Sequence, residues 1–225
     1  AGGLLSDGTS VSGAGHDPRS ALIRLAGEAA EQMALRLEMP LASGVLAPAL
    51  TDHPAYVAAE GPALLGVDWQ SSGARALPRA ILPEDPTKTA GFSEGLAAHT
   101  DRSQAQLHGV FELIERDAVT HWWAGATKAV SLAQSGTYAL ARLGPRRGRE
   151  TLLLDVSCDT HVPVIIAISF DAEGGSFCFG AAAKGTFETA INAALRELGA
   201  AEFGLSLERA KGADTGPENA DTNRA

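Results

Sequence analysis

Two glutamates three residues apart, Glu112 and Glu115, are the residues whose types and spacing most clearly indicate chemistry. On a helix this spacing puts both carboxylates on one face. The apolar residues between 107 and 118 recur at i, i+3 and i+4, which predicts an amphipathic helix. A loop of small residues, Gly95 to Ala98, and a cap-like Asp101 precede it. Such a loop offers backbone N–H groups to an anion, and the carboxylates could hold the divalent cation that the anion needs.

The same pattern of small-residue loop, cap, helix and glutamate occurs twice more, at Glu28 with Glu31 and at Glu197. Each time an alanine stands seven residues before the glutamate, and Glu28, Glu112 and Glu197 are separated by 84 and 85 residues. Self-similarity of this kind predicts equivalent structural units, although Ala- and Glu-rich helices also repeat by chance. Carboxylates that converge from three helices repel one another unless cations neutralise them. Mg²⁺ suits carboxylate oxygens and also takes substrate phosphates.

The third of these units departs from the other two. Ala200 stands three residues after Glu197, where the other units carry a second acid. The next acid, Glu202, comes at i+5 and therefore points well around the helix from Glu197. We expect Glu202 to face solvent.

The composition is that of a soluble globular protein: 225 residues, 45% hydrophobic and 20% charged. A net charge of −9 argues against nucleic acid or an anionic membrane as a partner. Two cysteines, Cys158 and Cys178, are too few for a disulfide framework. No apolar run approaches the roughly 20 residues that span a bilayer, and no basic-then-apolar leader opens the sequence. These features favour a cytoplasmic protein.

Helices and strands can be placed along most of the chain. Asp17 followed by Pro18 is a helix start, and Pro40 is expected to end that helix. Residues 41–92 contain many prolines, which predicts loops and short strands. Dense runs of Leu, Val and Ile at 151–157 and 162–170 predict two buried strands.

A third strand at 176–180 and a third amphipathic helix complete the pattern. The expected fold class is therefore α/β (α+β), with mixed β-sheets flanked by amphipathic helices. We expect a single domain over residues 1–210. Residues 211–225 have the composition of a disordered tail.

Residues 93–118, SEGLAAHTDRSQAQLHGVFELIERDA, resemble the signature of the YcaO family, a Ser-x-Gly loop followed by a helix reading Glu-Leu-x-Glu-Arg-Asp. Residues 13–32, GAGHDPRSALIRLAGEAAEQ, resemble the family's earlier G-x-G…G-E-x-x-E helix, and the likeness extends over about residues 10 to 205. The resemblance implies a YcaO-like fold and ATP- and Mg²⁺-dependent activation of a peptide-backbone amide. In that chemistry a nucleophile adds to the amide carbonyl, and the amide oxygen is phosphorylated by ATP and eliminated. Ribosomally made peptides acquire azolines, thioamides or amidines in this way.

Taken position by position, the resemblance implies a set of site residues but no catalytic side chain. The implied Mg²⁺ ligands are Glu28, Glu31, Glu112, Glu115 and Glu197, and the implied nucleotide-binding residues are Gly13, Ser93, Gly95 and Arg116. The implied cofactors are ATP and Mg²⁺, and the implied partners are a peptide substrate, an E1-like or TfuA-like protein and a second copy in a homodimer. Phosphoryl transfer needs positioning and charge neutralisation more than covalent chemistry from the protein.

Three positions differ from the family pattern. Ala14 stands where a basic residue is frequent, Ala193 where an arginine is expected, and Ala200 where a glutamine is usual. Two hypotheses therefore stay open: an ATP-dependent modifying enzyme, or a compact nucleotide- or peptide-binding subunit that has lost turnover. An unrelated carboxylate-rich metal hydrolase is a more remote third.

Other polar residues have simpler interpretations beside the functional ones. His108, one turn before Glu112, could be a metal ligand, but a core histidine or one that supports a ligand is the commoner case. Arg146, Arg147 and Arg149 have the spacing of a solvated turn, with contact to phosphate or to an acidic leader peptide as the alternative.

Overall fold

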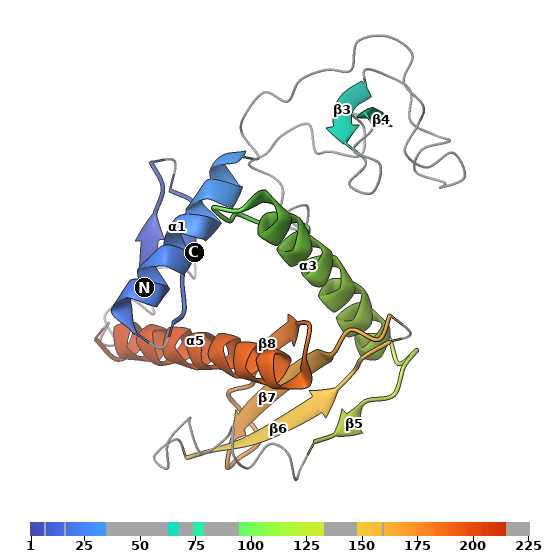
Figure 1. The fold of residues 1–225 in the computed structure, drawn as a ribbon. Helices are drawn as coiled ribbons and strands as arrows, with labels where there is room; N and C mark the ends of the chain where they lie inside the picture. The colour runs from blue at the N-terminus through green and yellow to red at the C-terminus, as the bar shows by residue number, and fades with distance from the viewer. Residues whose placement is uncertain are drawn as a thin grey trace, which may run out of the picture. The chain divides into compact units, whose positions relative to one another are not determined.

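The computed structural model describes residues 1–6, 8–15, 17–34, 63–67, 74–78, 95–132, 148–158 and 160–214 (Figure 1). The chain divides into two compact units, Ala1–Glu28 with Gly95–Ala225, and Ala29–Glu94. In the second unit, strands β3 (Ala63–Val67) and β4 (Ala74–Pro78) form an antiparallel pair. The single domain expected over residues 1–210 stays a prediction.

Three long helices carry the predicted glutamates: α1 (Pro18–Ala34), α3 (Arg102–Trp123) and α5 (Phe187–Asp214). Each begins after a side chain that accepts a hydrogen bond from the backbone N–H three residues later, which satisfies a donor that the helix itself leaves unpaired. These bonds run from Ser20 to Asp17 (2.9 Å), from Gln104 to Asp101 (2.9 Å) and from Thr189 to Thr186 (3.2 Å). The predicted helix start at Asp17 and Pro18 is confirmed.

The three helices share one further distance along the chain. Glu28, Glu112 and Glu197 each lie eleven residues after the capping residue of their helix. Equal spacing from equal caps puts the three glutamates at the same height on the three helices. It favours the internal repeat, whose structural equivalence stays a prediction.

A four-stranded antiparallel sheet forms the centre of the first unit. Its strands are β5 (Val130–Ser131), β6 (Arg149–Asp155), β7 (Val164–Asp171) and β8 (Cys178–Ala183), and they are paired in the order β5-β6-β7-β8. The three strands predicted from apolar runs are thus β6, β7 and β8. With the helices, they confirm the predicted α/β class.

Helices cover both faces of this sheet, which explains why β7 reads as a continuous apolar run. Ile165 and Ala167 pack in a cluster with the α5 residues, whereas Val164 and Ile166 pack on the other face with the α3 residues. α5 lies so close to β8 that a Cβ at Gly180 would be 2.3 Å from the backbone nitrogen of Leu198. Glycine is therefore required at Gly180 for the helix to pack on the strand.

A small hairpin precedes α1 in the first unit. Strands β1 (Gly2–Leu4) and β2 (Ser10–Ser12) pair antiparallel, and Val11 is buried. The hairpin leads into α1 through Gly13, where a Cβ would be 2.2 Å from the carbonyl oxygen of Ala21.

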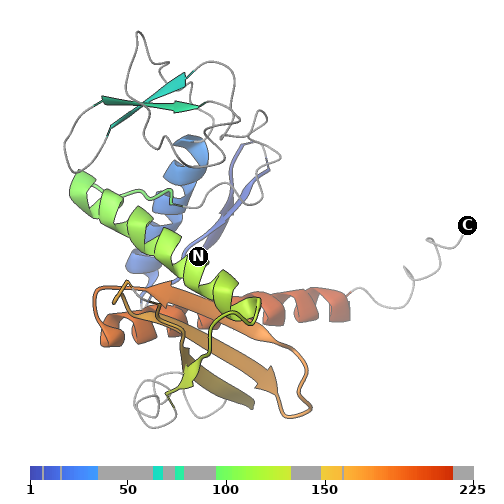
Figure 2. The same ribbon diagram turned by 90° about the vertical axis from the view of Figure 1, so that its right-hand side faces the viewer.

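The C-terminal helix α5 extends beyond the sheet (Figure 2). It ends at Asp214 and so includes the first four residues of the predicted tail, and residues 215–225 lie outside the described ones. None of the helices in the described part of the chain has the length and apolar character needed to cross a membrane.

Candidate functional site

Two glutamates from different helices meet at one edge of strand β8. Because Lys184 N–H is bonded toward the β7 side and antiparallel bonds alternate, the N–H groups of Ala181 and Ala183 point away from β7. The backbone of Ala183 favours the ionised form of Glu115 on α3, and the backbone of Ala181 favours that of Glu197 on α5. The two helices cover opposite faces of the sheet, yet each brings a carboxylate to the same strand edge.

These two carboxylates lie in a poorly solvated place. Burial raises the pKa of Glu115 to about 7, the charge of Glu197 adds to this rise, and Arg116 and Lys184 oppose it. Burial of the carboxyl group also raises the pKa of Glu197, although the residue as a whole is exposed to solvent. Two neighbouring carboxylates whose pKa values are both raised form a place where a cation is favoured.

Several basic side chains lie near the carboxylate pair: Arg116 and Lys184 act on both Glu115 and Glu197, and Arg196 acts on Glu197. Burial lowers the pKa of Lys184, and nearby Arg196 and Arg24 lower it further, against the opposing effects of Glu115 and Glu197. Burial and the charge of Arg24 likewise lower the pKa of Arg196. We call Arg24, Glu115, Lys184, Arg196 and Glu197 the Lys184 cluster. It combines a cation-binding pair of acids with cations that repel one another, a combination suited to a metal-bound polyanion.

The other predicted glutamates are placed differently. Glu112 forms an ion pair with Arg116, with 3.7 Å between the Oε1 and Nη2 atoms. Glu28 accepts a hydrogen bond of 2.7 Å from the backbone N–H of Ser12, so it ties α1 to β2. Glu31 belongs to the second unit of the chain.

The predicted nucleotide-binding loop before α3 is described from Gly95 onward, and Ser93 lies outside the described residues. Gly95 has a φ of +80°, a conformation that favours glycine. Its carbonyl oxygen lies against α3, where a Cβ at Gly109 would be only 2.4 Å away. Two glycines therefore allow the loop to lie directly on the helix that carries Glu112 and Glu115.

Within the part of the chain that the structure describes, no group of three or more His, Cys, Asp or Glu side chains is placed to hold a metal ion by itself. The set of five Mg²⁺ ligands implied by the family resemblance stays a prediction. Mg²⁺ does not require such a group, because it commonly binds one or two carboxylates and completes its shell with waters and substrate phosphates. The pair Glu115 and Glu197 fits that requirement.

A cavity of about 650 Å³ opens beside the cluster. One wall is the face of α5 that carries Asn192, Arg196, Ala200 and Phe203, and the facing wall includes β2 and the loop 13–15. Arg196 makes one long hydrogen bond, 3.4 Å, to the carbonyl of Asn192 in its own helix. The cavity is thus largely apolar, with a guanidinium at the side that adjoins the Lys184 cluster.

The three alanines that differ from the family pattern lie in two different environments, the cavity wall and the buried core. Ala14 and Ala200 line the cavity, where their small side chains leave space. Ala193 is buried in the cluster between α5 and the sheet. In this register the α5 cation that lines the cavity is Arg196.

His108 belongs to the margin of the site. Its ring stacks edge to face on His99 with 5.5 Å between centroids. Burial lowers the pKa of His108, and the charge of Lys184 lowers it further. This environment keeps the imidazole neutral. Its role as a metal ligand stays untested.

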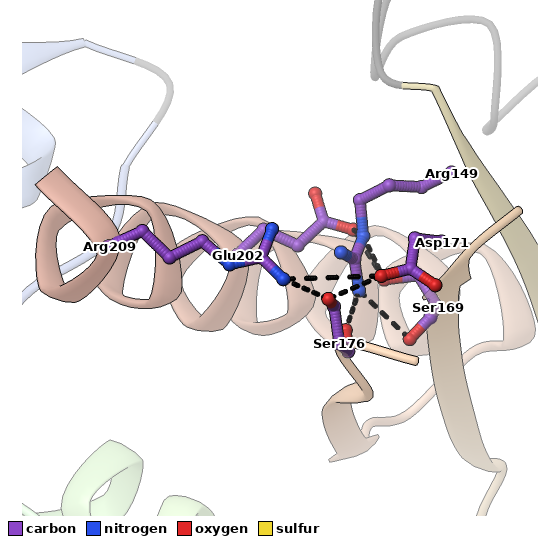
Figure 3. Close-up of polar contacts among 6 residues, drawn as sticks. All are labelled: Arg149, Ser169, Asp171, Ser176, Glu202 and Arg209. Atoms are coloured by element: carbon purple, nitrogen blue, oxygen red, sulfur yellow. Dashed lines mark hydrogen bonds and ion pairs between the residues drawn. The ribbon is translucent and has the colours of Figure 1, made fainter. Parts of the chain in front are cut away.

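A second polar cluster on α5 overturns two expectations (Figure 3). Glu202, expected to face solvent, is 15% exposed and lies 3.3 Å from Nε of Arg149. Arg149, expected in a solvated turn or on a phosphate, is 11% exposed and donates to Ser169 at 3.0 Å. The i+5 spacing turns Glu202 away from Glu197, but toward the sheet. We call this set the Arg149 network: Arg149, Ser169, Asp171, Ser176, Glu202 and Arg209.

Three residues of the Lys184 cluster were missed by sequence reasoning. Arg24 and Arg196 stand on helix faces that already carry predicted glutamates, and Arg196 directly precedes Glu197. Lys184 is the first of the two residues between the end of β8 and the cap of α5. A lysine between an alanine-rich strand and a helix cap was the available signal.

Comparisons with known proteins agree with this architecture. No curated protein matches the sequence. Among solved structures, a chain of the E. coli microcin synthetase McbBCD complex, solved with pro-MccB17 bound, has a TM-score of 0.67 and 14% identity over 91% of this chain and 60% of its own. A heterocyclase solved with substrate and cofactor has a TM-score of 0.67 and 20% identity, over 91% and 34%.

A third solved structure is YcaO from Methanopyrus kandleri, bound with AMPPCP and Mg²⁺. It has a TM-score of 0.65 and 22% identity over 93% of this chain and 59% of its own. At these identities the likenesses show the fold. The chain spans about a third to three-fifths of the length of these three structures.

The family comparison covers almost the entire chain. The family model described as YcaO cyclodehydratase, ATP- and Mg²⁺-binding, matches residues 12–225. The expected cofactors, ATP and Mg²⁺, are thus those of the family. The chain belongs to the YcaO family.

Proposed function

We propose that this chain binds Mg²⁺ and ATP at the Lys184 cluster and the adjoining cavity, and uses the nucleotide to activate a backbone amide of a ribosomally made peptide. The observation that carries the proposal is the meeting of two acids whose pKa values are raised by burial with three basic side chains, beside a largely apolar cavity. A pair of acids alone, or a single arginine alone, would not support a site for Mg²⁺ and ATP.

Each group has a role that its chemistry supports. Glu115 and Glu197 hold Mg²⁺ together with waters and phosphate oxygens. Arg24 and Arg196 neutralise phosphate charge, and Arg196 does so from the wall of the cavity that receives the nucleoside. Arg116, paired with Glu112, keeps that carboxylate oriented near the site. Among the residues predicted from the family pattern, Gly13 lines the cavity. The nucleotide contacts predicted at Ser93 and Gly95 and the metal contacts predicted at Glu28 and Glu31 stay predictions.

The proposed reaction follows the family's chemistry. ATP supplies the phosphoryl group that turns the amide oxygen into a leaving group, after a nucleophile has added to the amide carbon. The protein binds and orients the reactants and neutralises charge, since phosphoryl transfer asks little covalent chemistry of it. The product is an azoline when the nucleophile is a side chain of the peptide, and a thioamide when it is an external sulfide.

Partners complete the proposal. The McbBCD structure is a complex solved with pro-MccB17, and the second neighbour was solved with substrate and cofactor. By analogy we propose that this chain acts on a peptide in the cytoplasm, with an E1-like or TfuA-like protein and as a homodimer.

A second candidate function is a nucleotide- or peptide-binding subunit without turnover. Ala14 and Ala200 favour it, because both line the cavity at positions where the family pattern has polar side chains. Each removes a contact to a bound nucleotide, while the Lys184 cluster that would bind the phosphates remains.

Titration calorimetry with ATP and Mg²⁺ tests the binding step. Wild type should bind, and Glu115→Ala should lose at least about 10- to 100-fold in affinity, since changes in residues that merely support metal ligands already cost that much. The control on α5 is Glu188→Ala, which removes an exposed glutamate and should leave the affinity for ATP unchanged.

The outcomes separate the hypotheses. Wild type that fails to bind ATP with Mg²⁺ would sink the proposal. Binding without ATP hydrolysis, measured with the peptide and the partner protein present, would favour the subunit without turnover.

A further inference from the structure

Lys184 is held in a defined place by the backbone around it. It directly follows β8, and its N–H donates to the carbonyl of Pro163 with an N–O distance of 3.1 Å. Its ammonium nitrogen lies 5.6 Å from the centre of the Phe111 ring. A Cβ on the next residue, Gly185, would already be 3.9 Å from that ring. The lysine therefore lies between the end of the strand and the face of α3 that carries Phe111 and Glu115.

Among the residues that the structure describes, the ammonium of Lys184 lacks a close anionic partner. In that part of the chain it has neither a hydrogen bond nor a carboxylate within the 4.0 Å of an ion pair. Glu115 and Glu197 act on it from greater distance, and Arg24 and Arg196 repel it. A half-buried ammonium has lost part of its hydration, which is costly unless another group replaces the water.

The proposed Mg²⁺ site bears directly on the role of the Lys184 ammonium. A Mg²⁺ ion held by Glu115 and Glu197 would add two positive charges close to the lysine, and the two cations would repel each other. An anion that contacts both removes the conflict. In phosphoryl transfer the metal bridges the β- and γ-phosphate oxygens, and lysine is a common phosphate ligand because it acts as a compact point charge.

We propose that the Lys184 ammonium donates to the β- and γ-phosphates of the bound nucleotide, in the gap between Glu115 and Glu197. The inference rests on the proposed function and adds to it a residue that touches the ligand. It also gives this site a phosphate cation from the strand end, while Ala193, where the family pattern expects one, is buried against the sheet.

The competing explanation makes Lys184 a structural counter-ion. In that case the lysine only offsets the charge of Glu115 and Glu197, and its removal changes stability but not the affinity for nucleotide. The test must therefore report ligand affinity separately from folding.

The experiment is titration calorimetry with AMPPCP at saturating Mg²⁺, on wild type, Lys184→Met and Lys184→Arg. Lys184→Met should weaken AMPPCP binding by about 10- to 100-fold, the usual effect of losing a hydrogen bond to a charged group. Lys184→Arg should recover most of the affinity, because a cation is restored. Lys128→Met, which removes an exposed lysine between α3 and β5, should bind as wild type does.

AMP is the second probe, because it lacks both distal phosphates. The affinity for AMP should be the same for wild type and Lys184→Met. If neither protein binds AMP measurably, this expectation is also met. Urea unfolding of each variant shows whether it is folded, and Lys184→Gln is measured if the methionine variant is not.

The possible outcomes separate the inference from the proposed function on which it rests. AMPPCP affinity that is unchanged in Lys184→Met, or an equal loss for AMPPCP and AMP, overturns it. Wild type that binds no AMPPCP removes the proposed function itself. A selective loss for AMPPCP with recovery in Lys184→Arg supports the inference.

Discussion

Helix α5 takes part in two polar clusters that differ in one respect, whether their charges have close partners. Near its middle, Arg196 and Glu197 belong to the Lys184 cluster, where burial shifts the pKa values of several members. Five residues further on, Glu202 belongs to the Arg149 network (Figure 3), in which ion pairs and hydrogen bonds connect all six side chains.

The difference separates a structural cluster from a binding site. Ser169 is completely buried, and its hydroxyl both donates to Glu202 at 2.5 Å and accepts from Arg149 at 3.0 Å. Arg149 also reaches the backbone carbonyls of Ser169 and Ser176. A polar network satisfied in this way makes the fold rigid. In the Lys184 cluster, no carboxylate of the described residues lies at ion-pair distance from the Lys184 ammonium, and a ligand can use that charge.

The largest effect on stability is expected for Glu202→Ala. The substitution leaves the guanidinium of Arg149 largely buried without its carboxylate and removes the acceptor of the Ser169 hydroxyl. Removing one partner of a buried pair costs about 3 kcal/mol or more of unfolding free energy. Urea denaturation followed by circular dichroism measures the loss.

The control for Glu202→Ala is Glu188→Ala on the same helix, which should leave the unfolding midpoint close to that of wild type. Where the Glu202 variant remains folded, its affinity for AMPPCP should equal that of wild type. A Glu202→Ala protein of normal stability would contradict the view that the Arg149 network holds α5 on the sheet.

The next largest effect has the opposite sign and depends on pH. Glu115→Gln should stabilise the protein without metal, because it removes a carboxylate whose folded pKa, about 7, lies above its ordinary value of 4.5. Below pH 4.5 the carboxyl is protonated in both states and the gain is absent. The gain grows as pH rises from 4.5 to 7, where only the unfolded chain ionises. Above pH 7 it is constant, up to about 3 kcal/mol.

Denaturation of wild type and Glu115→Gln at pH 5 and pH 8, with a chelator present, checks this prediction. An equal difference in stability at the two pH values would show that Glu115 is not desolvated as described. The same proton competes with Mg²⁺, so the affinity of wild type for Mg²⁺ with AMPPCP should fall as pH drops below 7.

The sequence was informative wherever one local rule decided the structure. Apolar runs located β6 and β7, and caps located the starts of the helices, because both signals act over a few residues. Glu115 could be chosen from its spacing and from the family motif around it. Its meeting with Glu197 depended on how α3 and α5 pack on the sheet, which the family pattern implied and no spacing could show.

The errors concern residues whose partners are far away in the chain. Glu202 was expected in solvent because i+5 spacing turns it from Glu197, but its partner is Arg149, on β6, 53 residues earlier. Lys184 was not predicted as a site residue, because its environment is formed by side chains of both α3 and α5. Burial of a charged residue is decided by long-range packing, and composition favours exposure for such residues by default.

The smallest effect is expected at the solvent edge of the Arg149 network, for Arg209→Ala. The Arg209 guanidinium is 61% exposed and lies 4.0 Å from Asp171, a geometry in which water screens the pair. The hydrogen bond from the Ser176 hydroxyl is the largest cause of the lowered pKa of Asp171, and the charge of Arg209 is a smaller cause. The melting temperature should therefore fall by less than about 2 °C.

Ser176→Ala, which removes that hydrogen bond, should raise the pKa of Asp171 more than Arg209→Ala does, as NMR titration of the carboxyl would measure. The reverse order would mean that the edge of the network is held by charge, and that the contrast with the Lys184 cluster is smaller than the contacts indicate.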